Sequence, residues 1–189
     1  MAFTTHQTSL QGVLILEPKV FVDERGFFYE SFSQRDVAQA LNTNAIFVQD
    51  NHSESKKGVL RGLHYQIKQA QGKLIRVTKG EVFDVAVNLQ RGHPEFGRWV
   101  GIHLSATNKR QVWVPPGFAH GFLVLSEVAE LMYKTTDYYA HDHERSVLWN
   151  DPAIGIEWPL VGSPILAQKD AKASPLAHAD VFNFTSDEC

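Results

Sequence analysis

The chain has 189 residues, of which 43% are apolar and 21% are charged, and its net charge is -3. This length suits one well-buried domain, and the ordinary composition excludes a disordered or fibrous chain. The slight acidic excess argues against a general nucleic-acid binder, which needs a basic surface to hold phosphates.

The ends of the chain bear on its location. The N-terminal segment lacks the basic-then-apolar order of a signal peptide, and no apolar run approaches the roughly 18 residues of a membrane span. The single cysteine, Cys189, is the last residue, so neither a disulfide framework nor a thiolate metal site is expected. We therefore expect a cytoplasmic protein that binds neither membrane nor nucleic acid.

The first fifty residues contain two strand-like runs and a short helix. Residues 12–18 and 26–32 are rich in β-branched or aromatic side chains, which favours strands. Ser33 and Asp36 form the S-x-x-D pattern that begins many helices, which predicts a short helix over residues 33–42.

From Gly58 onward, short apolar runs separated by Gly, Pro and Asn replace any helical period. The predicted strands are 73–78, 81–89, 98–105, 111–117, 120–126 and 129–139. This spacing is typical of a β-sandwich or barrel. We predict one all-β domain over residues 1–189, of jelly-roll type with a few short helices, whose tail (about 160–189) packs back on the barrel.

The strand predicted over residues 81–89 is apolar on both faces at its centre. Because strand side chains alternate, even-numbered residues from Val82 to Asn88 share one face and odd-numbered residues from Phe83 to Leu89 share the other. We expect one face in the core between the sheets and the other lining a cavity, with Asp84 pointing into a pocket. The alternative is a solvent-exposed aspartate on an edge strand.

The segment around His64 has a recognisable spacing. Gly58, His64 and Gly80 are spaced as in the first motif of the cupin family, which this segment resembles. Gln66 stands where a metal-binding cupin has its second histidine, and Lys73 takes the position of the glutamate ligand. This resemblance implies a cupin-type jelly roll.

The segment 115–120 resembles the second cupin motif, although Val124 replaces the usual asparagine after His120. A zinc or iron site needs three or four donor side chains, and a lysine ammonium would repel a divalent ion. We therefore expect no metal and instead proton chemistry, with His64 as a base and Lys73 holding an enolate oxygen. The alternative for a lone histidine is a structural role.

A longer resemblance covers nearly the whole chain. The motifs GVLRGLHYQ (58–66), QGK (71–73) and YKTT (133–136), within a run that extends from ERGFFYESF (24–32) to AQKDA (167–171), resemble the dTDP-4-dehydrorhamnose 3,5-epimerase family. This resemblance implies inversion at C3 and C5 of dTDP-4-dehydro-6-deoxy-D-glucose on the route to dTDP-L-rhamnose, without a cofactor. It implies that His64 is the base, oriented by Asp170, that Lys73 lies near the enolate oxygen, and that Tyr133 is the acid.

The same resemblance implies a substrate-binding set and a homodimer. The binding residues would be Arg25, Glu30, Gln49, Asn51, Arg61, His120, Glu144 and Lys169, with Phe28 and Tyr138 as candidates for stacking on the base. An N-terminal strand, within about residues 1–50, would be exchanged between subunits. From the strand pattern itself we expect Asp84 and His120 to form a second His–Asp pair that positions the sugar.

Four alternatives remain open at this point. Two are enzymes of the same type: an epimerase that inverts only C3 or only C5, and one that acts on another nucleotide-activated 4-keto sugar. The third is a non-catalytic barrel that binds or senses a sugar nucleotide. The fourth is a metal-dependent cupin oxygenase or isomerase.

Overall fold

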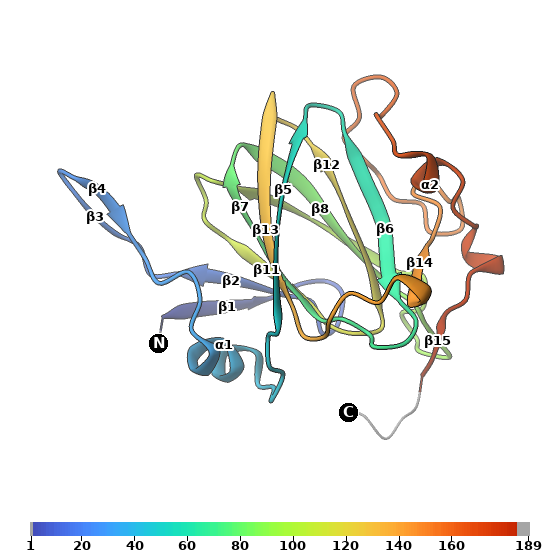
Figure 1. Ribbon diagram of the computed structural model, residues 1–189, viewed down its shortest axis with the longest axis horizontal. Coiled ribbons are helices and arrows are strands. Elements are labelled where there is room, and N and C mark those ends of the chain that lie inside the picture. The colour runs from blue at the N-terminus through green and yellow to red at the C-terminus, as the bar shows by residue number, and fades with distance from the viewer. Residues whose placement is uncertain (1, 185–189) are drawn as a thin grey trace.

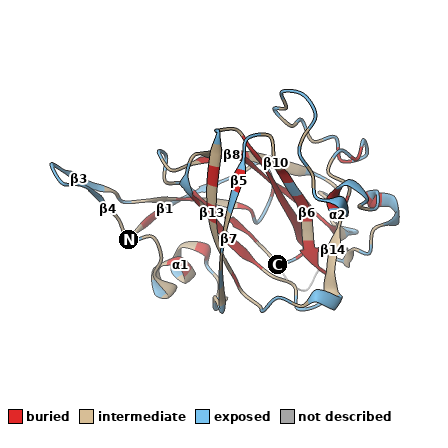
Figure 2. Ribbon diagram, turned by 45° about the horizontal axis from the view of Figure 1, so that its top comes forward, coloured by how far each residue is buried: buried red, intermediate tan, exposed pale blue. Residues whose placement is uncertain are grey.

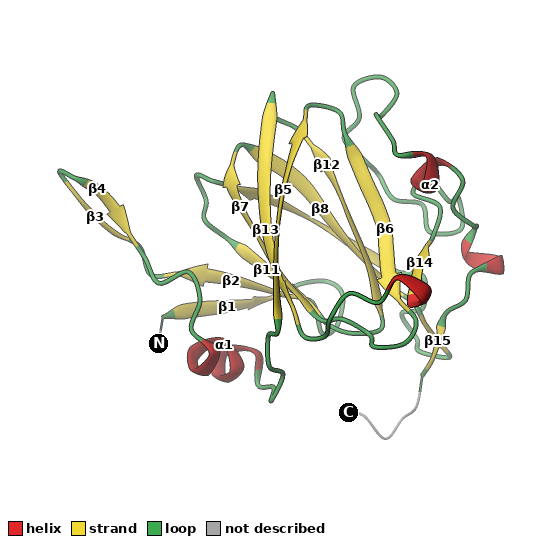
Figure 3. Ribbon diagram, in the orientation of Figure 1, coloured by secondary structure: helices red, strands yellow, loops and turns green. Residues whose placement is uncertain are grey.

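The computed structural model describes residues 2–184 and consists mainly of two facing antiparallel sheets (Figures 1 and 3). The six-stranded sheet contains, in spatial order, β1 (Phe3–Gln7), β2 (Leu14–Pro18), β11 (Gln111–Val114), β7 (Lys73–Lys79), β13 (Val128–Thr135) and β5 (Gln49–Lys56). The five-stranded sheet contains β10 (Trp99–Ser105), β8 (Glu81–Asn88), β12 (Phe118–Val124), β6 (Leu60–Gln66) and β14 (Glu144–Ser146). The predicted all-β class with few short helices is confirmed.

The remaining elements are short. Two strand pairs lie outside the main sheets: β3 (Phe21–Asp23) with β4 (Gly26–Phe28), and β9 (Gln90–Arg91) with β15 (Phe182–Asn183). The helices are α1 (Gln34–Leu41), α2 (Gln168–Ala171) and the 3₁₀ turns η1 (His141–His143) and η2 (Leu176–His178). None of the helices within residues 2–184 is both long and apolar enough to cross a membrane.

The N-terminal predictions had mixed outcomes. The helix is confirmed, and the hydroxyl of Ser33 accepts a hydrogen bond from the Asp36 amide at 3.3 Å, as the S-x-x-D pattern predicts. The strand predicted over residues 26–32 is wrong beyond Phe28, because β3 and β4 form a short hairpin that projects from the body of the molecule (Figure 1). Four of its aromatic or aliphatic side chains are exposed: Phe21, Val22, Phe27 and Phe28.

The six strands predicted from residue 73 onward correspond to β7, β8, β10, β11, β12 and β13. The strand β5 has no apolar alternation, since its sequence is QDNHSESK, and it was not predicted. It lies at the edge of the six-stranded sheet, with register Asn51↔Tyr133 on β13. The side chains on one of its faces are polar and partly or fully buried, and those on the other face are exposed, so neither face shows an apolar pattern.

Both faces of β8 are buried, as predicted, but the two faces pack against other parts of the molecule than expected. Val82 and Ala86 pack in the core between the sheets, whereas Val85 and Val87 pack under the C-terminal segment (Figure 2). The prediction that the second face lines a cavity is therefore wrong. The cavity and the core instead share the face of Val82 and Asp84.

The C-terminal segment covers the outer face of the five-stranded sheet. Ile154, Leu160 and Leu176 pack against residues of β6, β8 and β12, and the hydroxyl of Tyr65 donates to the carbonyl of Asp180. This cover holds the α2 turn beside β6, where residues 168–171 reach the pocket described below (Figure 1). Cys189 and the rest of residues 185–189 lie outside the described residues.

Candidate active site

A pocket opens at the end of the sandwich where polar side chains from both sheets face each other. Its lining residues are His64, Tyr65, Gln66, Gln71, Lys73, His120, Tyr133, Tyr139 and Glu144. Strand pairing explains this convergence: His64 lies directly opposite His120 on β12, and Gln66 lies opposite Glu144 on β14. The other sheet contributes Lys73 and Tyr133 from neighbouring strands β7 and β13. An imidazole, an ammonium group and a phenol therefore share one cavity.

His64 is held by a buried carboxylate. Its Nε2 lies 2.6 Å from Oδ1 of Asp170, which is 1% exposed, and Oδ2 of the same carboxylate accepts from the Gly62 amide at 3.3 Å. Burial raises the pKa of Asp170, but the hydrogen bonds from His64 and Gly62 and the charge of Lys169 outweigh burial and lower it. An ionised Asp170 favours the tautomer with a proton on Nε2, which leaves Nδ1 as the free base.

Lys73 is a buried cation beside the base. It is 8% exposed, and its Nζ donates to the main-chain oxygen of His64 at 3.2 Å. Burial lowers the pKa of Lys73 to about 8. The negative charges of Asp84 and Glu144 raise this pKa, but their effect is smaller than that of burial. The amine can therefore be charged at neutral pH while remaining poorly solvated, so it suits an oxygen that becomes negative during a reaction.

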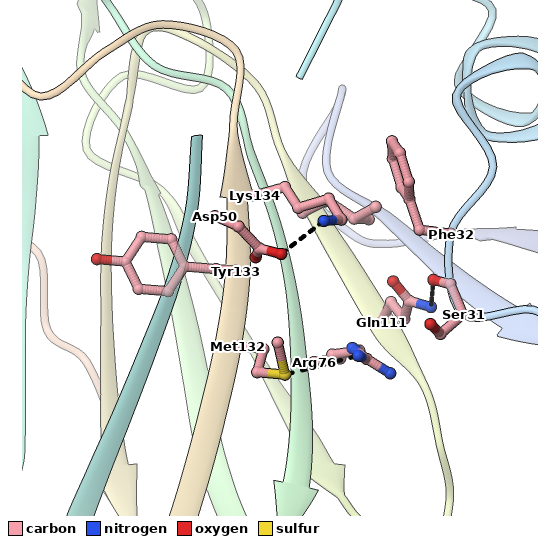
Figure 4. Close-up of a pocket in the computed structure, with 9 residues that line it drawn as sticks. Ser31, Phe32, Asp50, Arg76, Gln111, Met132, Tyr133 and Lys134 are labelled. Atoms are coloured by element: carbon pink, nitrogen blue, oxygen red, sulfur yellow. Dashed lines mark hydrogen bonds and ion pairs between the residues drawn. The ribbon is translucent and has the colours of Figure 1, made fainter. Parts of the chain in front are cut away.

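Tyr133 borders both this pocket and a second hollow on its sheet. Figure 4 shows that second hollow, where Asp50 binds Lys134 at 2.7 Å and the Tyr133 ring is directed away from both. Burial raises the pKa of Tyr133, partly offset by the charge of Arg61. The phenol therefore stays protonated at neutral pH and can act as a proton donor.

The predicted His120–Asp84 pair is present. Nε2 of His120 lies 2.8 Å from Oδ2 of Asp84, and Asp84 is 1% exposed. His120 lies within β12, directly across from His64. The positioning role of the pair stays a prediction.

A chain of polar contacts forms the rim of the pocket. The hydroxyl of Tyr139 lies 3.2 Å from Oε2 of Glu144, and Lys169 binds Oε1 of the same carboxylate at 2.7 Å. Burial raises the pKa of Glu144, but the Lys169 ammonium and the Tyr139 hydroxyl outweigh it and lower that pKa. The rim therefore carries a carboxylate and a cation that both have free hydrogen-bonding capacity for a polar ligand.

The other predicted binding residues divide into two groups. Gln49 and Asn51 share a hydrogen bond at 2.9 Å, and the pairing Asn51↔Tyr133 puts Asn51 on the face that bears the pocket. Arg61 bridges to β5, where its Nε donates to Ser55 at 3.0 Å. These three residues and Lys169 border the same end of the sandwich.

Arg25, Phe28 and Glu30 do not reach the pocket of their own chain. Arg25 pairs with Asp23 inside the β3–β4 hairpin at 2.6 Å, and Phe28 on the same hairpin is 70% exposed. The hairpin projects on the opposite side of the molecule from α2 (Figure 1). Their substrate-binding role therefore stays a prediction, and it depends on the expected exchange of this segment between subunits.

Two lining residues were missed or misassigned in the sequence. Tyr138 was the candidate for base stacking, but the neighbouring Tyr139 is the residue that lines the pocket, and both side chains are exposed, at 60% and 53%. Gln71 also lines the pocket and was quoted only as part of a motif. Adjacent tyrosines outside a regular strand carry no alternation signal, so the sequence could not tell which of them faces inward.

A bulge in β6 sets the direction of the His64 side chain. His120 pairs with His64, whereas Phe122 pairs with Arg61. A step of two residues along β12 therefore faces a step of three residues along β6, which is the mark of a bulge. Arg61 and His64 can therefore both face the pocket. Gly62 sits in the bulge with φ of 126°, and a Cβ there would lie 2.6 Å from Gly121 Cα and 2.9 Å from the His120 oxygen.

We expect Gly62→Ala to lower the free energy of unfolding by about 2–4 kcal/mol, because the methyl group meets main-chain atoms of the neighbouring strand β12. Urea unfolding measures this change. Gly58→Ala is the matched control: Gly58 also has a positive φ, of 75°, but a Cβ there meets nothing within 4 Å. Gly58→Ala should lower the free energy of unfolding by only about 1 kcal/mol. Equal losses in both variants would contradict the tight fit at the bulge.

No group of three or more His, Cys, Asp or Glu side chains within residues 2–184 is arranged to hold a metal ion. Besides His120 and Glu144, the pocket around His64 contains a lysine, two glutamines and tyrosines. Their chemistry suits proton transfer and hydrogen bonding more than metal coordination.

Comparisons with known proteins agree on one family. The family model described as dTDP-4-dehydrorhamnose 3,5-epimerase matches residues 7–178. The chain is 60% identical over 174 residues to a dTDP-4-dehydrorhamnose 3,5-epimerase from Pseudomonas aeruginosa. The aligned region covers 92% of this chain and 96% of that protein.

Two solved structures are close in shape. A dTDP-6-deoxy-D-glucose-3,5-epimerase from Legionella pneumophila, in complex with dTDP-4-keto-L-rhamnose, matches with a TM-score of 0.95 and 50% identity, over 97% of this chain and 100% of that one. A 3'-monoepimerase from Streptomyces bikiniensis, in complex with dTDP-quinovose, matches with a TM-score of 0.86 and 35% identity, over 91% of this chain and 87% of that one.

Proposed function

The chain belongs to the dTDP-4-dehydrorhamnose 3,5-epimerase family, and from this premise we propose that it inverts C3 and C5 of dTDP-4-dehydro-6-deoxy-D-glucose to form dTDP-4-dehydro-L-rhamnose. One observation carries the proposal: His64, Lys73 and Tyr133 line one pocket, and the base and the phenol come from opposite sheets. Inversion of a carbon needs a base on one face and an acid on the other.

The proton is removed by Nδ1 of His64. The C4 ketone acidifies the hydrogens on C3 and C5, and the electrons of the broken C–H bond move to the ketone oxygen as an enolate. Asp170 keeps the Nε2–H in place and stabilises the imidazolium that forms. The same base serves both carbons in successive steps.

Lys73 stabilises the enolate oxygen, and Tyr133 returns a proton to the same carbon from the opposite face. The ammonium of Lys73 lies in a poorly solvated position, where its attraction for a developing oxyanion is stronger than in water. Each inversion leaves His64 protonated and Tyr133 deprotonated, and exchange with solvent resets both groups. No redox step and no cofactor enter this scheme.

The rim of the pocket is proposed to bind the nucleotide and the diphosphate. Arg61, Lys169, Gln49 and Asn51 supply donors and acceptors there, and Tyr139 replaces Tyr138 as the candidate for stacking on the base. The single domain is proposed to act as a homodimer, in which the β3–β4 hairpin brings Arg25, Phe28 and Glu30 to the partner subunit's pocket. The exposed apolar side chains of that hairpin support this arrangement.

The test of the proposal is incubation with dTDP-4-keto-6-deoxyglucose in deuterated water, followed by NMR. Deuterium at both C3 and C5 with the L-rhamno configuration is the expected result. Deuterium at only one carbon would identify a monoepimerase, and no exchange would favour a binding barrel. Loss of activity in a chelator, restored by a divalent metal, would favour a metal-dependent cupin.

We expect Tyr133→Phe to separate exchange from inversion. The variant keeps His64 and Lys73, so the proton is still removed, but reprotonation from the opposite face falls by about 10²-fold. Deuterium incorporation and formation of the inverted product are measured in parallel. Tyr65→Phe is the control: Tyr65 borders the pocket, but its ring packs in the cluster on the outer face and its hydroxyl donates to the Asp180 carbonyl there. Unchanged product formation in Tyr133→Phe would remove the phenol from the scheme.

A further inference from the structure

Three glutamine side chains hold the main chain that runs from β13 toward η1. Each of the four residues 137–140 has one main-chain polar group bound by a side-chain amide. The four bonds are Gln71 Nε2 to the Asp137 oxygen at 2.9 Å, Gln66 Nε2 to the Tyr138 oxygen at 3.2 Å, the Tyr139 amide to Gln49 Oε1 at 2.9 Å, and the Ala140 amide to Gln66 Oε1 at 2.8 Å.

Gln66 is central to this arrangement. It is 4% exposed, and its Nε2 also donates to the carbonyl of Gln69 at 2.8 Å. The orientation of its amide group follows from its partners, because the Ala140 N–H needs an oxygen and two carbonyls need donors. Both hydrogens of Nε2 are therefore committed to the main chain. Gln66 stands where a metal-binding cupin has a histidine, yet here its amide joins three segments of backbone.

The segment 137–140 depends on such contacts for its position. It has no regular secondary structure, and it follows directly on β13, which carries Tyr133. Its Tyr139 side chain lines the pocket, with the hydroxyl 3.2 Å from Glu144. A shift of this backbone would move the pocket wall without moving His64, Lys73 or Asp170, which lie on β6, β7 and α2.

We infer that Gln66 is a positioning residue: its side-chain amide holds residues 138–140 so that Tyr139 and Glu144 form the nucleotide-binding wall of the pocket. This inference rests on the proposed function, because it assigns that wall to nucleotide binding. An uncharged amide suits the place, since it satisfies both carbonyl and N–H groups without adding a charge beside Lys73 and Glu144.

The first test is Gln66→Leu, a variant of similar size that cannot form the three hydrogen bonds. We expect the Kd for dTDP, measured by calorimetry, and the KM to rise about tenfold, while kcat changes by less than about threefold. Gln34→Leu is the matched control. Gln34 binds the main chain of Ala45 and Phe47 in the same two-sided way, at 2.7 and 3.2 Å, but it lies at α1, far from the pocket.

The second test is Gln66→Glu, which keeps the shape of the side chain. An ionised carboxylate faces the carbonyls of Gln69 and Tyr138 without a hydrogen to donate, whereas a protonated one can donate to one of them. The ratio of the variant's dTDP Kd to that of the wild-type protein should therefore be high near pH 8 and approach one near about pH 5. A residue that only stabilises the fold would not produce this recovery.

The two proposals fail in different ways. If the wild-type protein does not bind dTDP, the proposed function is wrong. If it binds dTDP and Gln66→Leu binds equally tightly, the positioning inference is wrong. Equal weakening in Gln34→Leu, or a ratio for Gln66→Glu that does not change with pH, would also overturn the inference.

Discussion

His64→Asn should abolish deuterium incorporation at both C3 and C5. An asparagine amide cannot accept a proton at neutral pH, so the base is lost, and Asp170 still accepts from the Gly62 amide. Because one imidazole is proposed to serve both carbons, exchange at C3 and exchange at C5 should fall together, by roughly 10³-fold. NMR in deuterated water measures both rates on one sample.

A matched control separates base catalysis from the loss of any histidine–carboxylate pair. His103 pairs with Glu81 at 3.0 Å on the surface of the five-stranded sheet, so His103→Asn makes the same chemical change away from the pocket. It should leave both exchange rates near those of the wild-type protein. If exchange at one carbon persisted in His64→Asn, a second base would be required and the single-base scheme would be wrong.

Lys73→Met should reduce the rate of inversion by about 10³-fold, because the enolate oxygen loses its cation. The charged form of Lys73 decreases as pH rises through its pKa of about 8. The wild-type rate should therefore fall above that pH if the ammonium is needed. Lys79→Met on the same strand is the control, since Lys79 is exposed and pairs with Glu130. Inversion at the wild-type rate in Lys73→Met would remove the cation from the scheme.

The same substitution should also stabilise the protein. The pKa of Lys73 is lowered from 10.5 to about 8, so burial of the ammonium destabilises the fold at neutral pH, by on the order of 1–3 kcal/mol. This cost is fully present below about pH 8 and is lost as pH rises toward 10.5, where the unfolded chain also loses its proton. The stability advantage of Lys73→Met, measured by thermal unfolding, should therefore be larger at pH 7 than at about pH 10. An advantage that does not change with pH would contradict this account.

Short motifs identified most of the residues that meet in the pocket. His64, Lys73, Tyr133 and Asp170 were assigned from resemblance to a family, and the structure brings the first three into one cavity, with the fourth bound to His64. The Asp84–His120 pair followed from strand alternation alone, because an isolated carboxylate in an apolar strand must find a partner when it is buried. The chemical types of the side chains were sufficient for these inferences.

The sequence left undecided where a segment lies relative to the rest of the molecule. Phe28 and Arg25 have the right residue types for a nucleotide site, but the hairpin that carries them projects from the fold. Tyr138 and Tyr139 are adjacent and chemically identical, and only hydrogen bonds from Gln49 and Gln66 to the backbone decide that Tyr139 faces the pocket. Residue type carries no information about such distant contacts.

By itself, the sequence determined the all-β class and most strands after residue 73, because alternating apolar side chains need a core on at least one face. It could not reveal β5, whose side chains are polar on both faces. Tertiary structure alone decided that Arg61 and His64, three residues apart, point to the same side. That outcome requires the bulge at Gly62, and a bulge exists only through the register of β6 against β12, a strand more than fifty residues away in the chain.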